Sequence, residues 1–507
     1  MSLLAVDIGS STCKAVVFAC SGQVLATASA HYSPEFPRVS FAEMNPEKFW
    51  NAVCSCCRQA CEHLTEPVQA LCLSSHGETF VPVDSHCMPL MNAIFNQDSR
   101  AIRESAWCEE AIGRERLFQL TGLFAHPMYP IPKILWLRKN QPDVFASAKC
   151  FLSLIGYLLH KMQLPPYVDY SLASRYLAFD VRRRSWSEEI LAATELDRAA
   201  LPMPVPAGTI TGKVNSETAN QLGIPAGTPV VLGGHDQPCG ALGTGVVDSG
   251  RVADSMGTYE CLLAASDAPT LTEKALNASL NSYCHVVPEK FVTLAYFPSG
   301  IMVKWFHDLL YANGSGGIAL ESLSVDAEAE HYALLEAHAP EGPTGLCITP
   351  HLIGTCNPEF NPHARAVIVG LGPATDRAHL YKGILEGIAC ELSIVAEALS
   401  DAVGDFSDIY ATGGGTRSTL GLQLRAALTG RRMHIMRRQE SVCLGTAILA
   451  GVAIGEYNSI GEAVTALVED CITVAPGLEL AASYREQMGR YRQLRSAMIQ
   501  QASSSPS

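Results

Sequence analysis

The segment Asp7-Ile8-Gly9-Ser10-Ser11-Thr12-Cys13-Lys14 is the most informative part of the chain for predicting its fold. An apolar run ends at Asp7, a turn of small residues follows, and a second apolar run begins at Lys14. After Ser21-Gly22, another turn, a third such run follows. We therefore predict a β-meander with strands at Leu3–Val6, Lys14–Ala19 and Val24–Ala28.

The composition of this first turn is suited to binding phosphate. Glycine and small hydroxyl residues allow backbone N–H groups to approach phosphate oxygens, and a carboxylate such as that of Asp7 can hold hydrated Mg²⁺. The residue types alone favour an ordinary β-turn. The chain has no Gly-x-x-x-x-Gly-Lys-Ser/Thr motif, so a P-loop is not expected.

A second hairpin with the same plan is predicted near the middle of the chain. Arg251–Ser255 and Tyr259–Ala264 are predicted strands, and Gly257-Thr258 is the tight turn between them. Two such hairpins half a chain apart predict two related α/β halves with a ligand in the cleft between them. The predicted domains are residues 1–247 and 248–490, followed by a helix end and a frayed tail over 491–507.

Two other glycine-rich segments lie where a predicted strand gives way to a helix. In Gly233-Gly234-His235-Asp236-Gln237-Pro238, the carboxyl group of Asp236 follows the strand Pro229–Leu232. Catalytic groups are often found at such junctions, but Asp236 or Gln237 can equally be a simple helix cap. Thr412-Gly413-Gly414-Gly415 allows close approach by a flat ligand such as a purine, although a plain turn is the alternative.

Length and charge restrict the classes of function. The chain has 507 residues, which corresponds to about three ordinary domains or two large ones. Its net charge is −14 and it has no extended basic stripe, so a nucleic acid partner is not expected. It also lacks an apolar run of transmembrane length and a basic signal-peptide start, so we expect no membrane association and a cytoplasmic location.

The eighteen cysteines are expected to be free thiols in a reducing compartment. Cys54-x-x-Cys57 is half of a possible metal site, but no second pair at ligand spacing follows it. A helix that Asn45 caps and Pro46 begins would place these residues on a buried face. We therefore predict that this cysteine group is core packing.

Taken in order, the motifs resemble those of the FGGY carbohydrate kinases from about residue 3 to residue 490. The resemblance implies an α/β fold of the actin-like ATPase (ribonuclease H-like) class, with two duplicated α/β domains and a central cleft. It rests on the first hairpin, Gly234–Gln237, Ser255-Met256-Gly257-Thr258, Gly413–Gly415, Glu440-Ser441 with Leu444-Gly445, Met128–Leu137, and Ala366–Leu371 with His379-Leu380 and Ile384-Leu385-Glu386.

Several roles follow from this resemblance. Asp236 would be the catalytic general base, ATP and Mg²⁺ would be the cofactors, and Asp7 and Asp236 would be the metal-binding residues. ATP would contact Asp7, Gly9, Ser10, Ser11, Thr12, Lys14, Gly257, Thr258, Gly413, Gly414, Gly415 and Ser418. The sugar would contact His76, Glu78, Asp98, Tyr129, Asp236 and Gln237. At Gly421 the chain lacks an aromatic residue that relatives carry, which changes the packing expected around the base.

The expected reaction is ATP-dependent phosphorylation of a hydroxyl group of a small sugar. The expected substrate is a ketose such as D-xylulose, and gluconate, a deoxyketose or a polyol are alternatives within the family. An actin-like ATPase without a sugar substrate, either a filament former or a dehydratase activator, is the alternative of another class. The resemblance also implies a homodimer.

Overall fold

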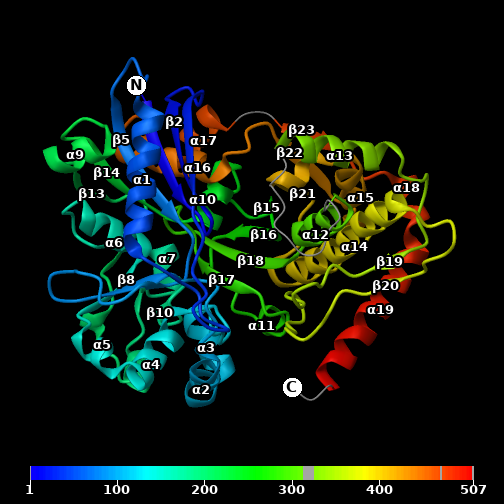
Figure 1. Ribbon diagram of the computed structural model, residues 1–507, viewed down its shortest axis with the longest axis horizontal. Coiled ribbons are helices and arrows are strands. Elements are labelled where there is room, and N and C mark those ends of the chain that lie inside the picture. Colours follow the sequence, from blue (N-terminus) through cyan, green and yellow to red (C-terminus); the bar gives the residue numbers. More distant parts are fainter. Residues whose placement is uncertain (1, 312–324, 469–470, 505–507) are drawn as a thin grey trace.

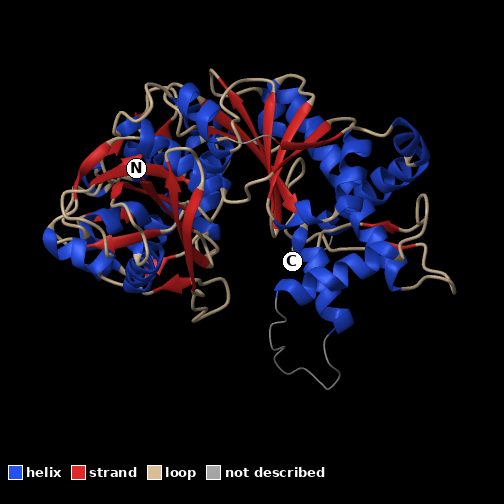
Figure 2. Cartoon of the chain, turned by 90° about the horizontal axis from the view of Figure 1, so that it is seen from above, coloured by secondary structure: helices blue, strands red, loops and turns tan. Residues whose placement is uncertain are grey.

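A computed structural model describes residues 2–311, 325–468 and 471–504. Figure 2 shows two bodies side by side, each built around a sheet with helices packed against it. The first sheet has the strand order β13-β14-β5-β1-β2-β3, and the second has the order β17-β18-β16-β15-β21-β22-β23. Both therefore belong to the mixed α/β class that the sequence predicts.

The first sheet begins with the predicted meander. β1 pairs antiparallel with β2, and β2 pairs antiparallel with β3. β1 then runs parallel to β5, β5 runs parallel to β14, and β14 pairs antiparallel with β13. The strands are β1 (Ser2–Ile8), β2 (Thr12–Ala19), β3 (Val24–His31), β5 (Val68–Ser75), β13 (Ile210–Lys213) and β14 (Pro229–His235).

The second sheet repeats this pattern of pairing. β15 pairs antiparallel with β16 and β16 with β18, whereas β15 and β21, and β21 and β22, are parallel. β23 is antiparallel to β22, and the additional strand β17 extends the other edge. The same order of directions in both sheets confirms the predicted duplication. The strands are β15 (Arg251–Met256), β16 (Tyr259–Ser266), β17 (Asn281–Cys284), β18 (Phe291–Pro298), β21 (Asp408–Thr412), β22 (Arg432–Met436) and β23 (Cys471–Val474).

Two helices join the halves through closely approaching glycines. A Cβ atom on Gly243, in α10 (Asp236–Gly243), would lie 1.8 Å from the Ser441 carbonyl oxygen. A Cβ on Gly445, in α16 (Ser441–Ala453), would lie 1.9 Å from the Cys239 carbonyl oxygen. α16 comes late in the sequence, but its apolar residues share a core with Leu3 and Ala5 of β1. In Figure 1 this orange helix accordingly lies beside the blue strands of the first half.

The helix that carries the cysteine group follows the predicted pattern. α1 (Pro46–Cys61) is capped by the Asn45 side chain, which accepts a hydrogen bond from the Glu47 N–H at 3.0 Å. Cys54, Cys56 and Cys57 are buried in the core. All eighteen cysteines are free thiols. Among the described residues, no group of three or more His, Cys, Asp or Glu side chains is arranged to hold a metal ion.

Helix α19 (Arg485–Ser504) ends the described part of the chain and overlaps the predicted helix end and tail over 491–507. Residues 505–507 of that predicted tail lie outside the described residues. The longest helix, α14 (Arg377–Val403), begins at Asp376, whose side chain accepts hydrogen bonds from the N–H groups of Ala378 and His379.

Candidate active site

Asp236 lies at the junction where β14 ends and α10 begins. The two preceding glycines allow this junction to approach its neighbours closely. A Cβ on Gly233 would lie 2.2 Å from the Leu73 carbonyl oxygen, and a Cβ on Gly234 would lie 2.7 Å from Ser171 Oγ. The Asp236 side chain is 19% exposed, so it is partly enclosed yet accessible to a small ligand.

Asp7 at the end of β1 provides a second carboxylate near Asp236. Ser74 Oγ donates to Asp7 Oδ1 at 3.0 Å. Burial raises the pKa of Asp7 to about 6, while the hydrogen bond from Ser74 and the charge of Lys14 oppose the shift. Burial raises the pKa of Asp236 well above its usual range, and the negative charges of Asp7 and Glu78 raise it further.

This carboxylate pair fits a magnesium ion bound together with a phosphate ligand. Mg²⁺ is usually held by one or two carboxylates, with its other positions filled by phosphate oxygens and water. A bound cation would compensate the like charges that raise the pKa of Asp236. Asp7 and Asp236 are thus suitable metal-binding residues.

The first hairpin turn presents its backbone beside these carboxylates. The Gly9 N–H donates to the Thr12 carbonyl oxygen at 3.0 Å, and the Tyr32 hydroxyl donates to the Gly9 carbonyl oxygen at 2.6 Å. Ser10 is half-buried and Ser11 is exposed at the tip. Thr12 Oγ1 lies 3.0 Å from Nδ1 of His31, a partner that the sequence did not indicate.

Lys14 links this hairpin to the second half of the chain. Its Nζ lies 3.8 Å from Oε1 of Glu440, the residue directly before α16. Both side chains are partly exposed, so the ion pair is of a kind that contributes little to stability. Lys14 can therefore release Glu440 and reach toward a phosphate oxygen.

A cavity of about 610 Å³ lies over the second sheet. Its lining contains five residues of the predicted nucleotide site, and all of them come from the second half of the chain. They are Gly257, Thr258, Gly414, Gly415 and Ser418.

Gly413 is not in the lining, but its backbone shapes this cavity. It has φ +94°, and a Cβ there would lie 2.7 Å from the Met256 carbonyl oxygen. Its N–H donates to Gln439 Oε1 at 2.8 Å. The loop after β21 therefore needs glycine at this position.

Two stacked tyrosines line the same cavity. The rings of Tyr332, from α13 (Val325–Ala337), and Tyr381, from α14, have centroids 5.9 Å apart with an interplanar angle of 22°. At Gly421, a Cβ would lie 2.8 Å from Ser418 Oγ. The aromatic surface of this cavity thus comes from helices α13 and α14.

Near Asp236, Glu78 forms a buried ion pair. Arg175, at the end of α7 (Tyr170–Ser174), donates from Nε to Glu78 Oε1 at 2.6 Å. The Tyr129 hydroxyl donates to Asn281 Oδ1 at 2.8 Å, and Asn281 belongs to β17 in the second half. Both halves therefore contribute side chains to this side of the site.

Two predicted sugar-binding side chains are already engaged within the protein. His76 places Nδ1 2.9 Å from the Ile8 carbonyl oxygen and Nε2 2.7 Å from Thr79 Oγ1, so neither ring nitrogen is left for a ligand. Asp98 is fully buried and binds Arg100 through both carboxylate oxygens. These contacts favour a structural role for His76 and Asp98, in which they hold neighbouring segments in place and do not contact the sugar. Gln237 is half-buried in the first turn of α10.

Sequence reasoning missed three residues that the fold brings to Asp236: His235, Arg175 and Tyr283. His235 lies within the quoted motif, but we assigned it no role. Arg175 is a single charge within the apolar run Leu172–Phe179, a pattern that indicates a buried, paired cation. Tyr283 shows no signal in the sequence, because only the pairing of the two halves brings β17 to the site.

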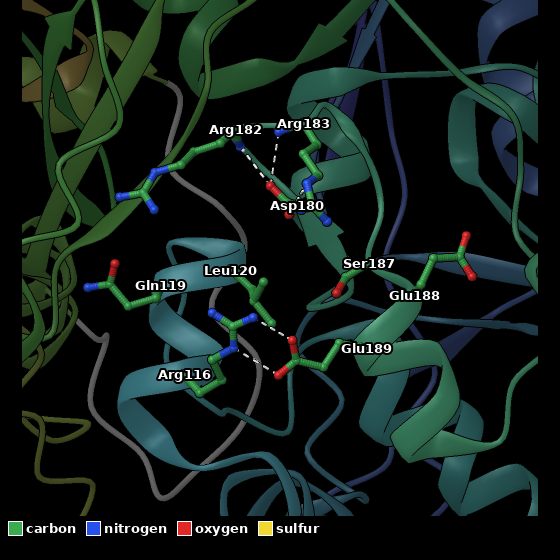
Figure 3. A pocket seen from close by; sticks show the side chains of 9 residues that line it. All are labelled: Arg116, Gln119, Leu120, Asp180, Arg182, Arg183, Ser187, Glu188 and Glu189. Atoms are coloured by element: carbon green, nitrogen blue, oxygen red, sulfur yellow. Dashed lines mark hydrogen bonds and ion pairs between the residues drawn. The ribbon is translucent and has the colours of Figure 1, made fainter.

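A separate hollow of about 230 Å³ lies between α3 (Arg114–Thr121), β10 (Phe179–Asp180) and α8 (Glu188–Thr194). Figure 3 shows Arg116 and Glu189 pointing toward each other across it, with Arg116 Nε 2.8 Å from Glu189 Oε1. Asp180 Oδ1 accepts hydrogen bonds from the N–H groups of Arg182 and Arg183. None of the predicted site residues lines this hollow.

No helix in the described ranges combines the length and the apolar character needed to cross a lipid bilayer.

Comparisons with known proteins match nearly the whole chain. The N-terminal domain model of the FGGY family of carbohydrate kinases matches residues 2–243, and the C-terminal domain model matches residues 252–454. A gluconokinase of Bacillus licheniformis is 28% identical over 98% of this chain and 96% of its own length. A xylulose kinase of Staphylococcus xylosus is 23% identical over 97% of this chain and 99% of its own length.

A solved structure shows the same fold. The gluconate kinase of Lactobacillus acidophilus superposes with a TM-score of 0.88 at 23% identity, over 99% of this chain and 98% of its own. The two sheets, the paired hairpins and both domain models agree with the expected actin-like ATPase architecture. This chain belongs to the FGGY family of carbohydrate kinases.

Proposed function

We propose that this kinase transfers the γ-phosphoryl group of ATP to a hydroxyl group of a ketose such as D-xylulose, with Asp236 as the general base. The observation that carries the proposal is the position of Asp236. It lies at the start of α10, near Asp7 and the first hairpin on one side and the Glu78–Arg175 pair on the other.

Asp236 would remove the proton from the acceptor hydroxyl as its oxygen attacks phosphorus. A raised pKa suits this role, because a base whose pKa lies nearer to the working pH takes up a proton more readily. His235 Nε2 lies 3.2 Å from Asp236 Oδ1 and holds the carboxylate in orientation. Such a base contributes roughly 10²- to 10⁴-fold in rate.

The hairpin and the cavity would hold the donor. We propose that the backbone of Gly9–Thr12 contacts the phosphates and that the glycine-lined cavity takes the adenosine. Asp7 and Asp236 are the residues that would hold Mg²⁺, which offsets phosphate charge when it is bound. Because the two groups of residues lie on different halves, closure of the halves would exclude water from the reacting atoms.

Other acceptors are the alternatives within the family. The relatives include enzymes named for gluconate and for xylulose, so their names support both. A deoxyketose or a polyol is a further alternative. Family membership favours a sugar kinase over an actin-like ATPase without a sugar substrate.

A coupled assay of ADP release tests the proposal. The full chain would be supplied with MgATP and, in turn, with D-xylulose, other ketoses, aldoses, polyols and D-gluconate. We expect rapid ADP release with a ketose. A rate with every acceptor no higher than the background rate without acceptor would contradict the proposal.

A further inference from the structure

The ion pair between Glu78 and Arg175 is buried next to the proposed base. The two side chains are 4% and 5% exposed, and their shortest N–O distance is 2.6 Å. Glu78 has φ +62°, a left-handed conformation that is uncommon for a residue with a Cβ.

The guanidinium group of Arg175 lies close to two aromatic rings. Its Cζ lies 5.2 Å from the ring centroid of Tyr129 and 4.9 Å from that of Tyr283. Tyr129 comes from the first half of the chain and Tyr283 from the second. The guanidinium group is therefore fixed where the two halves meet, and its charge interacts favourably with both rings.

One donor of this guanidinium group is left without an acceptor. Nη1 of Arg175 is buried and has no hydrogen-bond partner among the described residues. Buried polar groups in folded proteins are nearly always paired, with protein, ordered water or a ligand, so this donor needs a partner from one of these sources. A ligand oxygen would satisfy it.

Contacts connect Arg175 with Asp236. A Cβ on Gly77 would lie 3.2 Å from Arg175 Cγ and also 3.2 Å from His235 Cδ2, so both side chains lie against this glycine. His235 in turn lies 3.2 Å from Asp236. The charges of Glu78 and Arg175 both affect the pKa of Asp236, in opposite directions. The ion pair therefore lies close to His235 and to the proposed base.

The charges around this position favour an uncharged acceptor. The positive charge of Arg175 is matched by Glu78. Burial, with Lys133 and Arg175 nearby, lowers the pKa of His126 to about 4, so this ring adds no positive charge. Lys133 donates to the Phe95 carbonyl oxygen at 2.7 Å. A sugar acid would add a carboxylate beside those of Asp236 and Glu78.

We propose that the Glu78–Arg175 pair selects an uncharged polyhydroxy acceptor, a ketose or a polyol, over a sugar acid. Arg175 donates from Nη1 to an oxygen of the acceptor, and Glu78 accepts a hydrogen bond from one of its hydroxyl groups. This inference rests on the proposed function and narrows its substrate class.

The first test compares acceptors with the unmodified protein. kcat/KM is measured by ADP release for D-xylulose, D-ribulose, xylitol and D-gluconate at saturating MgATP. We expect the best uncharged acceptor to exceed D-gluconate by at least about tenfold. A preference for D-gluconate would overturn this inference and leave the kinase assignment intact. No ADP release with any of the four would contradict both.

The second test removes one charge at a time. Glu78→Gln keeps the size of the side chain but leaves Arg175 uncompensated, so the ratio of kcat/KM for D-xylulose to that for D-gluconate should fall by about tenfold. Glu189→Gln is the matched control, because it breaks an Arg–Glu pair of the same type that is about half exposed and lies outside the site. An unchanged ratio in Glu78→Gln would overturn the selecting role.

A double variant keeps the proposal testable if the single variant Glu78→Gln does not fold. Removing one partner of a buried ion pair leaves an unpaired charge, whereas replacing both partners is far better tolerated. Glu78→Gln combined with Arg175→Met should fold, and its KM for D-xylulose should rise about tenfold while its KM for ATP changes less than about twofold. An unchanged KM for D-xylulose would overturn the proposed contact.

Discussion

His235 connects the proposed base to the opposite half of the chain. Its Nε2 lies 3.2 Å from Asp236 Oδ1, and its Nδ1 lies 3.1 Å from the Tyr283 hydroxyl. Tyr283 belongs to β17 in the second sheet, whereas His235 ends β14 in the first. Since burial and Arg175 lower the pKa of His235, the neutral ring can accept from the Tyr283 hydroxyl with Nδ1, while its Nε2 faces Asp236.

Tyr283→Phe should lower kcat, because His235 loses the partner that fixes its orientation toward Asp236. The loss of one neutral hydrogen bond corresponds to about two- to tenfold in kcat. The KM for ATP should stay constant in the steady-state assay. Tyr176→Phe is the control, since its hydroxyl donates to the Phe151 carbonyl oxygen away from the site. Equal loss of kcat in both variants would show a general packing effect.

The glycine contact between α10 and α16 should control stability. Gly243→Ala would place a Cβ 1.8 Å from the Ser441 carbonyl oxygen, and we expect it to lower the free energy of unfolding by about 1–3 kcal/mol or more. Gly240→Ala lies on the same helix, where a Cβ would meet Val442 Cγ2 at an ordinary 3.5 Å. It should be neutral or stabilising. Urea unfolding of both variants measures the difference, and similar stabilities would refute this account of the helix contact.

Substitutions in the glycine loop after β21 should weaken the binding of ATP and leave the binding of the sugar unchanged. A Cβ on Gly414 would meet no atom within 4 Å, so the fold tolerates a side chain that projects into the open cavity. Gly414→Leu should raise the KM for ATP by about tenfold or more, which corresponds to about 1.4 kcal/mol of lost binding. Gly414→Ala, the smaller control, should have a weaker effect. A change confined to the KM of the sugar would argue against the nucleotide assignment.

The charge of Glu78 should affect the pH dependence of kcat/KM. Asp236 acts as a base only when deprotonated, so kcat/KM falls as the pH drops through its raised pKa. Glu78 is one cause of that raised pKa. Glu78→Gln should therefore lower the pKa of Asp236 and move the acidic limb of the pH profile to lower pH. If the acidic limb of Glu78→Gln moved to higher pH, the assignment of Asp236 as the base that titrates there would be contradicted.

Local features of the fold were predictable from the sequence, because each depends on neighbouring residues. The turn Gly9–Thr12, the Asn45 cap and the strand-to-helix junction at Asp236 all follow from turn and capping preferences. The repeated hairpin also indicated the duplication.

Contacts between distant segments were not predictable in this way. Asn281 and Tyr283 reach the acceptor side only through the packing of β17 against α7, and the Tyr332–Tyr381 stack joins two separate helices. His76 and Asp98 matched the expected motif but use their polar atoms within the protein. The domain boundary near Val247, the homodimer and the cytoplasmic location stay predictions.

The central claim is that Asp236 acts as the general base of a sugar kinase. The most direct measurement compares Asp236→Asn with the unmodified protein in sugar-dependent ADP release and, separately, in equilibrium binding of ATP. We predict a fall in turnover of roughly 10²- to 10⁴-fold, with ATP affinity within a fewfold of the unmodified protein. Near-native turnover in Asp236→Asn would contradict the account.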